Sequence, residues 1–202
     1  MLEGKIITFE GGEGSGKSTI IKLFTEYLKN KNVDVVKFRE PGSSSIAEQI
    51  REVIVNKKNT EMCYETEALL YAAARAQLLN EKVIPLLKED KTIIFDRFID
   101  SSLVYQGYCR GLGPERILEM NKFIGENFPY KTFLLDLDPK IGFERILSNN
   151  RETNRLDDEP MEFHNNIRKY YLELAKQFPE RIVVINANQT PEKVLEDVIA
   201  AL

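Results

Sequence analysis

The sequence of 202 residues is poor in the residues that many catalytic and metal sites require. It contains no tryptophan, a single histidine, His164, and two cysteines, Cys63 and Cys109. A histidine-based catalytic triad or a multi-histidine metal site would depend on that one residue, which lies in a charged helical pattern. The cysteines have neither metal-ligand nor redox spacing, so we expect two free thiols in a reducing compartment.

Long apolar runs and an excess of positive charge are also lacking. No stretch approaches about 18 consecutive apolar residues, so we expect no membrane span. The formal net charge is -4, which argues against broad nucleic-acid binding, because such binding needs a basic face. A local cluster of arginines could still bind a small anion. The length suits one domain over residues 1–202.

Five short apolar runs, rich in β-branched and aromatic residues, are typical of parallel strands buried on both faces. They cover residues 5–10, 33–38, 91–95, 132–137 and 181–186. Helical patterns occupy residues 17–30, 44–57, 65–89, 98–108, 114–126, 139–149, 159–178 and 190–201. This alternation predicts an α/β fold with three layers, in which helices flank a five-stranded parallel sheet. Pro85 should kink or shorten its helix.

The segment GGEGSGKST follows the first apolar run. Its Gly11-x-x-x-x-Gly16-Lys17-Ser18 pattern, placed between a strand and a helix, is typical of a phosphate-binding P-loop. Lys17 can reach the β- and γ-phosphates of a nucleotide, and Ser18 can offer its hydroxyl to Mg²⁺. The expected nucleotide-binding residues are Gly11, Gly12, Glu13, Gly14, Ser15, Gly16, Lys17, Ser18 and Thr19. This loop alone does not separate kinases from GTPases, ATPases or motors.

A second polar feature ends the third apolar run, where Asp96 and Arg97 follow Phe95. An acid at the carboxyl end of a parallel strand lies where ligands bind. Asp96 can therefore hold Mg²⁺ directly or through water. The planar guanidinium of Arg97 can bind a second phosphate with two hydrogen bonds. The alternative is a structural Asp-Arg pair.

Other polar and aromatic residues could complete a second site. Arg39 follows the second apolar run and could face the same crevice, or lie in an exposed turn. Tyr71 and Arg75 share one helix face among alanines, which suits a planar base but also suits a core tyrosine beside an arginine that extends to the surface. Ser102 and Gln106 are four residues apart, and a glutamine amide could bind a base edge. An ordinary helix face is the alternative.

Two arginines, Arg151 and Arg155, lie in the polar segment 148–160, which we expect to be a mobile lid. Lids that carry arginine close over substrate in phosphoryl-transfer enzymes, although a solvated charged loop would look similar. The scarcity of histidine favours an acceptor that needs no general base. A nucleoside monophosphate fits, since its phosphate is already charged near pH 7.

These motifs, taken in order, resemble those of the thymidylate kinase family. The resemblance runs from about residue 5 to the C-terminus. Its segments are Phe9-Glu10-Gly11, the P-loop with Glu13, Arg39-Glu40-Pro41-Gly42, Asp96-Arg97-Phe98, Ser101-Ser102-Leu103-Val104-Tyr105-Gln106-Gly107 and Asn154-Arg155-Leu156-Asp157. The combination is far more specific than the P-loop alone. It implies transfer of the γ-phosphoryl of ATP to dTMP, with Mg²⁺, in dTTP biosynthesis by a cytoplasmic homodimer.

The resemblance also implies roles for individual residues. Lys17 and Ser18 would serve ATP and Mg²⁺, and Glu13 would approach the 3′-hydroxyl region of the acceptor sugar. Some members carry the catalytic arginine in the P-loop and others, mainly bacterial, in the lid. Because positions 12–15 contain no arginine, this chain resembles the lid type. The expected catalytic residues are Glu13, Lys17, Arg97, Arg151 and Arg155.

The remaining matches describe an acceptor site for dTMP. The expected substrate-binding residues are Arg39, Arg51, Tyr71, Arg75, Arg97, Ser102 and Gln106. Two positions depart from the family pattern. Tyr71 stands where phenylalanine usually stacks on thymine, which leaves strict thymine preference open. Ser43 replaces a second glycine after Arg-Glu-Pro-Gly, so the turn there could differ.

Two other classes remain possible from the residues alone. One is another small P-loop kinase, for a different monophosphate or for a deoxynucleoside, although a nucleoside acceptor would benefit from a general base. The other is a GTPase-type switch. That class would need an Asn-Lys-x-Asp motif for guanine, which the sequence does not contain.

Overall fold

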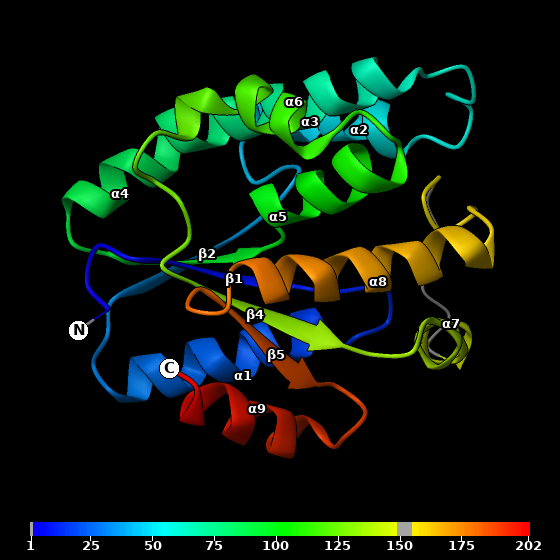
Figure 1. The fold of residues 1–202 in the computed structure, drawn as a ribbon. Helices are drawn as coiled ribbons and strands as arrows, with labels where there is room; N and C mark the ends of the chain where they lie inside the picture. The colour runs from blue at the N-terminus through cyan, green and yellow to red at the C-terminus, as the bar shows by residue number, and fades with distance from the viewer. Residues whose placement is uncertain (1, 149–154) are drawn as a thin grey trace.

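The computed structural model describes residues 2–148 and 155–202. Its centre is a parallel sheet of five strands in the order β2-β3-β1-β4-β5 (Figure 1). The strands are β1 Ile6–Glu10, β2 Val35–Arg39, β3 Thr92–Asp96, β4 Lys131–Asp136 and β5 Ile182–Asn186. The predicted fold class and all five predicted strands are confirmed, with shifts of one or two residues at their ends.

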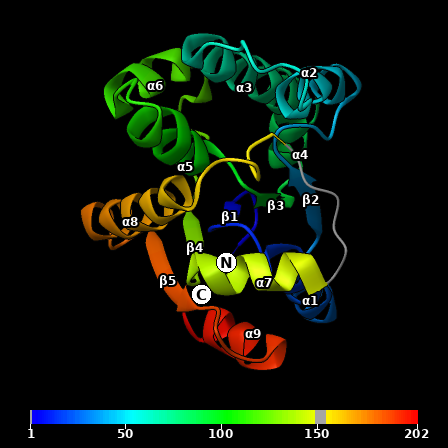
Figure 2. The same cartoon turned by 90° about the vertical axis from the view of Figure 1, so that its right-hand side faces the viewer.

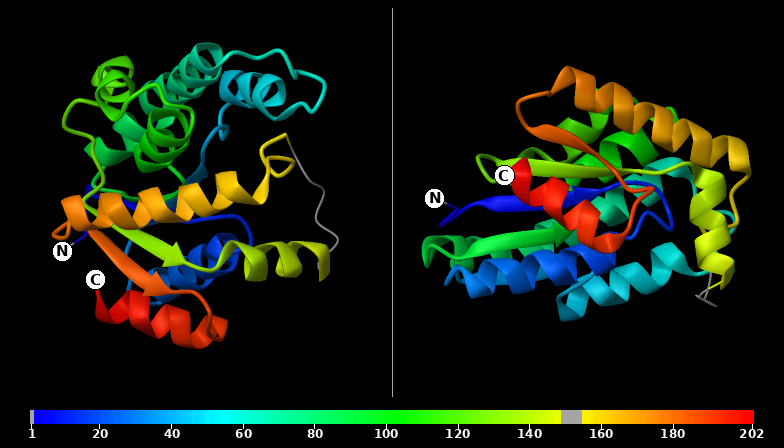
Figure 3. Two further views of the ribbon diagram at one scale, coloured as in Figure 1. Left: turned by 45° about the vertical axis from the view of Figure 1, so that its right-hand side comes forward. Right: turned by 90° about the horizontal axis from the view of Figure 1, so that it is seen from below.

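Helices cover both faces of the sheet. The α-helices are α1 Lys17–Asn30, α2 Ser45–Val55, α3 Tyr64–Leu78, α4 Ile84–Lys88, α5 Ile99–Ser102, α6 Pro114–Met120, α7 Pro139–Ser148, α8 Met161–Gln177 and α9 Pro191–Ala200. The shorter turns are η1 Leu79–Val83, η2 Leu103–Cys109 and η3 Lys122–Ile124. Helices α1 and α9 lie together on one face (Figure 3), and α3, α5 and α8 lie on the other (Figure 2).

Three predicted helices are divided in the structure, and one of them, the segment 114–126, forms α6 and then the 3₁₀ turn η3. The segment 65–89 forms α3, the π-helical turn η1 and then α4, which contains Pro85 in its first turn. Proline has no N–H to donate, so a wide turn before it avoids an interrupted α-helical ladder. The segment 98–108 forms α5 and the π-helical turn η2. The α-helical ladder is interrupted at η1, immediately before the turn that contains Pro85, and the helix continues to Lys88.

The strand register gathers the polar strand ends at one edge. Phe9 pairs with Asp96 between β1 and β3, and Arg39 pairs with Asp96 between β2 and β3. Two buried clusters, one on each face, hold the sheet in place. The P-loop, the end of β2 and the Asp96-Arg97 pair therefore meet at this edge.

Two expectations from composition concern the whole chain. Cys63 and Cys109 are both free thiols, as expected. Within residues 2–148 and 155–202, none of the helices has the length and apolar character needed to span a membrane.

Candidate active site

The P-loop connects β1 to α1 through glycines in conformations that other residues rarely adopt. Gly11, Gly14 and Gly16 have φ values of 139°, 68° and 87°. A Cβ on Gly11 would lie 2.5 Å from the carbonyl oxygen of Leu135, so β4 leaves no space for a side chain. No side chain caps α1, which leaves the first amides of this helix available to an anion.

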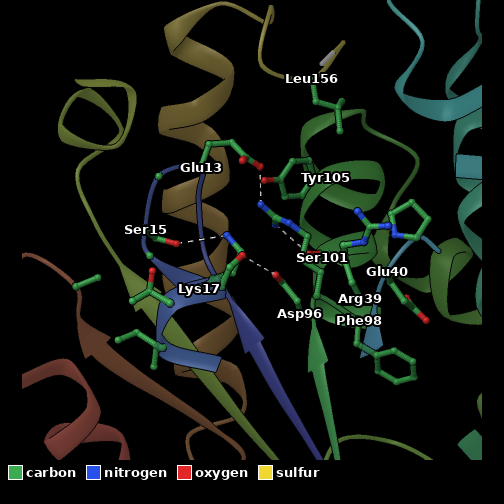
Figure 4. A pocket seen from close by; sticks show the side chains of 18 of the residues that line it. Glu13, Ser15, Lys17, Arg39, Glu40, Asp96, Phe98, Ser101, Tyr105 and Leu156 are labelled. Carbon is green, nitrogen blue, oxygen red and sulfur yellow. Dashed lines mark hydrogen bonds and ion pairs between the residues drawn. The ribbon is translucent and has the colours of Figure 1, made fainter. Parts of the chain in front are cut away.

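The side chain of Lys17 curls back into the loop. Its Nζ donates to the carbonyl oxygens of Gly11 and Gly12, at 3.0 and 2.9 Å, and to Ser15 Oγ at 3.3 Å (Figure 4). Burial and the Arg97 guanidinium, opposed by nearby carboxylates, lower the pKa of Lys17 to about 8. These loop oxygens hold the ammonium where the phosphates of a nucleotide would take their place.

The expected metal ligands also meet. Ser18 Oγ donates to Asp96 Oδ2 at 3.3 Å. One hydroxyl and one carboxylate fit Mg²⁺, which prefers oxygen ligands and takes the rest of its coordination from water and phosphates. In residues 2–148 and 155–202 there is no group of three or more acidic, histidine or cysteine side chains that could hold a metal by themselves.

Arg97 projects into the centre of the site from a strained position directly after β3. Its φ is 67°, in the left-handed region that L side chains seldom adopt. The guanidinium donates to Glu13 Oε1 at 2.6 Å, to Ser101 Oγ at 3.2 Å and to Tyr171 Oη at 3.4 Å. It also lies 5.3 Å from the ring centroid of Tyr105. The structure thus brings the expected Glu13 and Arg97 together.

A buried carboxylate supports Arg97 from behind. Glu10 is fully buried and accepts hydrogen bonds from Tyr171 Oη at 2.7 Å, from Ser101 Oγ at 2.6 Å and from the amide of Phe98 at 2.8 Å. Burial and the nearby Asp100 raise the pKa of Glu10, although Arg97 opposes them. Sequence reasoning did not predict roles for Tyr171 or Tyr105. Glu10 could have been found from the sequence, because it belongs to the Phe9-Glu10-Gly11 segment of the family resemblance.

Arg39 and Arg51 lie beside the end of β2. Arg39 pairs with Glu48 on α2 at 2.9 Å, and both side chains are nearly half exposed. Arg51 donates to the carbonyl oxygen of Pro41 at 3.1 Å. The turn between them carries Ser43 at φ 68°, a position that favours the glycine usual in the family. Both arginines are therefore near the phosphate site with partners that an incoming anion could replace.

Tyr71 and Arg75, both on α3, lie in different environments. Tyr71 is partly buried and lines the central cavity, and burial raises its pKa to about 12. Arg75 is only 1% exposed. Its guanidinium is fixed by Glu40, at 2.8 and 2.7 Å, by Asn121 at 2.7 Å and by Ser102 at 3.1 Å. Neither the role of Glu40 nor that of Asn121 was predicted from the sequence.

Gln106 and Arg155 share one buried partner, Glu67. Gln106 Nε2 donates to Glu67 Oε1 at 2.9 Å, and Arg155 Nη2 donates to Glu67 Oε2 at 2.5 Å. Arg155 also donates to the carbonyl oxygen of Ile54 at 3.0 Å. Arg155 therefore contacts α2 and α3 in this structure. Arg151 lies outside the described residues.

A single cavity of about 710 Å³ joins these parts. All seven substrate-binding residues expected from the sequence line it, together with residues 13–19 and Asp96. Sequence reasoning did not predict Arg145 of α7 or Gln189, which line the nucleotide side. A cavity of this size accommodates an extended ligand or two ligands whose phosphates meet.

Two anion sites in one cavity, one of them a P-loop, define a phosphotransferase that moves a phosphoryl group between two bound molecules. The family model for thymidylate kinase matches residues 9–198. The chain is 50% identical over 200 residues to a thymidylate kinase of Clostridium novyi, covering 98% of each chain, and 53% identical over 197 residues to one of Anoxybacillus flavithermus, covering 96% and 94%. A crystal structure of thymidylate kinase from Ehrlichia chaffeensis matches with a TM-score of 0.78 and 32% identity, covering 97% of each chain. The chain belongs to the thymidylate kinase family.

Proposed function

We propose that this protein transfers the γ-phosphoryl of ATP to dTMP, giving dTDP and ADP, as a step in dTTP synthesis. The observation that carries this proposal is the continuity of the cavity from the P-loop to the pocket of Tyr71, Arg75 and Gln106. An aromatic ring, a guanidinium and an amide suit a pyrimidine base, which can stack and also form hydrogen bonds at its edge.

The residues act by alignment and charge neutralisation. An oxygen of the acceptor phosphate is already negative near pH 7, so it can attack without a general base. Arg97 holds that phosphate in line, while Lys17 and the loop amides bind the donor phosphates. Ser18 and Asp96 would hold Mg²⁺, which neutralises charge on the donor phosphates when bound. Glu13 would face the acceptor sugar from beside Arg97.

For the catalytic cation we propose Arg151 and Arg155, because positions 12–15 of the P-loop contain no arginine. Arg155 would exchange its present partner Glu67 for a phosphate oxygen. Replacing either residue by alanine should lower kcat by about 10³-fold while dTMP affinity changes little. Unchanged turnover in both single variants and in the double variant would reject this assignment.

The acceptor itself is tested by measuring ADP release over a panel of nucleotides and nucleosides. We expect dTMP to give the highest kcat/KM of the panel. If another monophosphate or a deoxynucleoside is the better acceptor, the protein is a different small P-loop kinase. Tight GTP binding without acceptor-dependent turnover would indicate a nucleotide switch instead.

We also propose that the protein is a cytoplasmic homodimer, as the family resemblance implies. Apolar side chains on three neighbouring helices support a dimer surface. Ile46 and Val53 of α2, Leu69 of α3 and Leu118 of α6 are 50%, 45%, 54% and 41% exposed. These helices lie together on one side of the sheet (Figure 2). Sedimentation should give twice the chain mass, and Leu69→Glu should shift it to one chain mass; a wild-type monomer would contradict the proposal.

A further inference from the structure

The side-chain amide of Gln106 is oriented by one hydrogen bond. Gln106 is 1% exposed and lines the cavity. Its Nε2 donates to Glu67 Oε1 at 2.9 Å, and among residues 2–148 and 155–202 its Oε1 has no hydrogen-bond partner. One N–H of the amide is thus bound on the side of α3, and the amide oxygen is available to a ligand in the cavity.

The chemistry of Glu67 makes this orientation obligatory. A carboxylate only accepts hydrogen bonds, so the neighbouring amide must present its NH₂ group to it. Although burial alone would raise the pKa of Glu67, Arg110 and Arg155 beside it hold that pKa below its usual value. Arg110 Nε lies 3.4 Å from Glu67 Oε1 and Arg155 Nη2 lies 2.5 Å from Glu67 Oε2. Glu67 is therefore ionised and cannot donate.

We propose that Glu67 is a positioning residue for base selectivity, which fixes Gln106 so that its amide oxygen accepts from a ring N–H of the acceptor base. Thymine carries such an N3–H between two carbonyl groups. Cytosine instead carries an unprotonated N3 beside an amino group. An amide oxygen at position 106 and a guanidinium at Arg75 match the first pattern and oppose the second. The inference rests on the proposed function, because it assumes a pyrimidine monophosphate acceptor.

The Glu67→Gln substitution distinguishes this positioning role from that of a structural ion-pair partner. An amide at position 67 can accept through its oxygen or donate through its NH₂ group, whereas the carboxylate of Glu67 can only accept. In the Glu67→Gln variant, Gln106 is therefore no longer obliged to turn its NH₂ group toward α3, and it can turn over and present that NH₂ group to the cavity. The Glu67→Gln substitution should therefore remove the fixed hydrogen-bonding character of the pocket with almost no change in side-chain volume.

The test compares dTMP with 5-methyl-dCMP, two acceptors with the same 5-methyl group and sugar that differ in the hydrogen-bonding edge of the base. The readout is kcat/KM from ADP release. For Glu67→Gln we expect kcat/KM with dTMP to fall about tenfold or more, and the ratio of dTMP to 5-methyl-dCMP to narrow by about tenfold or more. Equal losses for both acceptors, with an unchanged ratio, would overturn the proposal.

The double variant Glu67→Gln/Gln106→Glu is the matched control. Here the carboxylate at position 106 accepts from the amide at position 67 and keeps a second oxygen for the base N–H. We expect it to recover the dTMP preference, and it decides the question if the single variant does not fold. The proposal would be overturned if the folded double variant had a dTMP to 5-methyl-dCMP ratio of kcat/KM as narrow as that of the single variant, or no preference for dTMP.

The wild-type measurement distinguishes a failure of the proposed function from a failure of the role proposed for Glu67. A wild-type protein that does not prefer dTMP contradicts the proposed function itself. A wild-type protein that prefers dTMP, combined with an unchanged ratio in Glu67→Gln, contradicts only the role of Glu67.

Discussion

The contact between the P-loop and α7 predicts that one substitution should lower activity much more than it lowers stability. Gly142 is buried in α7 against the loop. A Cβ at this position would lie 2.2 Å from the carbonyl oxygen of Glu13, and a Cβ on Gly14 would lie 2.1 Å from the carbonyl oxygen of Gly142. Two glycines therefore let backbone meet backbone here. The Gly142→Ala variant adds one methyl group to this contact.

Two effects of opposite sign determine the stability of the Gly142→Ala variant. Ordinary Cβ contacts begin at 3.4 Å, so loop and helix must separate by about 1 Å, and overpacking of this kind costs about 1–3 kcal/mol. Alanine in place of glycine inside a helix returns about 1 kcal/mol. The net destabilisation should be about 0–2 kcal/mol. A shift of about 1 Å in the loop, by contrast, lowers catalysis by about 10²-fold.

The assay is therefore a pair of measurements on the same variant. We expect kcat/KM for ATP to fall about 10²-fold while chemical unfolding shows a loss of at most about 2 kcal/mol. Glu144→Ala, at an exposed position of the same helix, controls for substitution in α7. Unchanged kcat/KM together with raised stability, as helix propensity alone would give, would refute the reasoning.

Three further predictions concern other residues. Tyr71→Ala should weaken dTMP binding by about 1–3 kcal/mol through loss of stacking; unaltered affinity in a titration would reject the stacking role. Lys17 has a pKa of about 8, and phosphates bind its charged form, so ATP affinity should fall as pH rises through 8 by at most about tenfold per pH unit; equal dissociation constants at pH 7 and 9 would contradict this. Arg181→Ala should cost about 3 kcal/mol of stability, because it leaves the buried Asp100 carboxylate without its 2.6 Å ion pair; a loss below about 1 kcal/mol in chemical unfolding would show that this pair contributes little.

Much of the fold follows from local sequence. The strands are continuous apolar runs because parallel strands are buried on both faces, and the P-loop is readable because its glycines and lysine are adjacent. The division of segment 98–108 into α5 and η2 was not predicted, since a π-helical turn of 7 residues is too short to show a period of its own. Gly107 there packs against Pro114, where a Cβ would lie 3.3 Å from the Pro114 Cα, and such a tertiary contact is invisible to periodicity.

The candidate site was predictable where its residues belong to short motifs and not where distant segments meet. Tyr171 reaches Glu10 across 161 positions of sequence, and nothing near Tyr171 indicates this. Arg39 pairs with Glu48, whereas the adjacent Glu40 is buried against Arg75. Successive side chains of a strand point to opposite sides, so sequence neighbours at its end need not be partners.

The charge of the cavity and the charge of the chain have opposite signs. The chain carries a net charge of -4, whereas Arg39, Arg51, Arg75 and Arg97 line one cavity. A nucleic acid would have to approach the acidic exterior along its length, while a mononucleotide enters the cationic interior alone. Salt screens exposed charges over about 8 Å at physiological ionic strength and buried ones much less. The negative net charge of the chain and the arginine lining of the cavity together favour a small anion over a polyanion as the ligand.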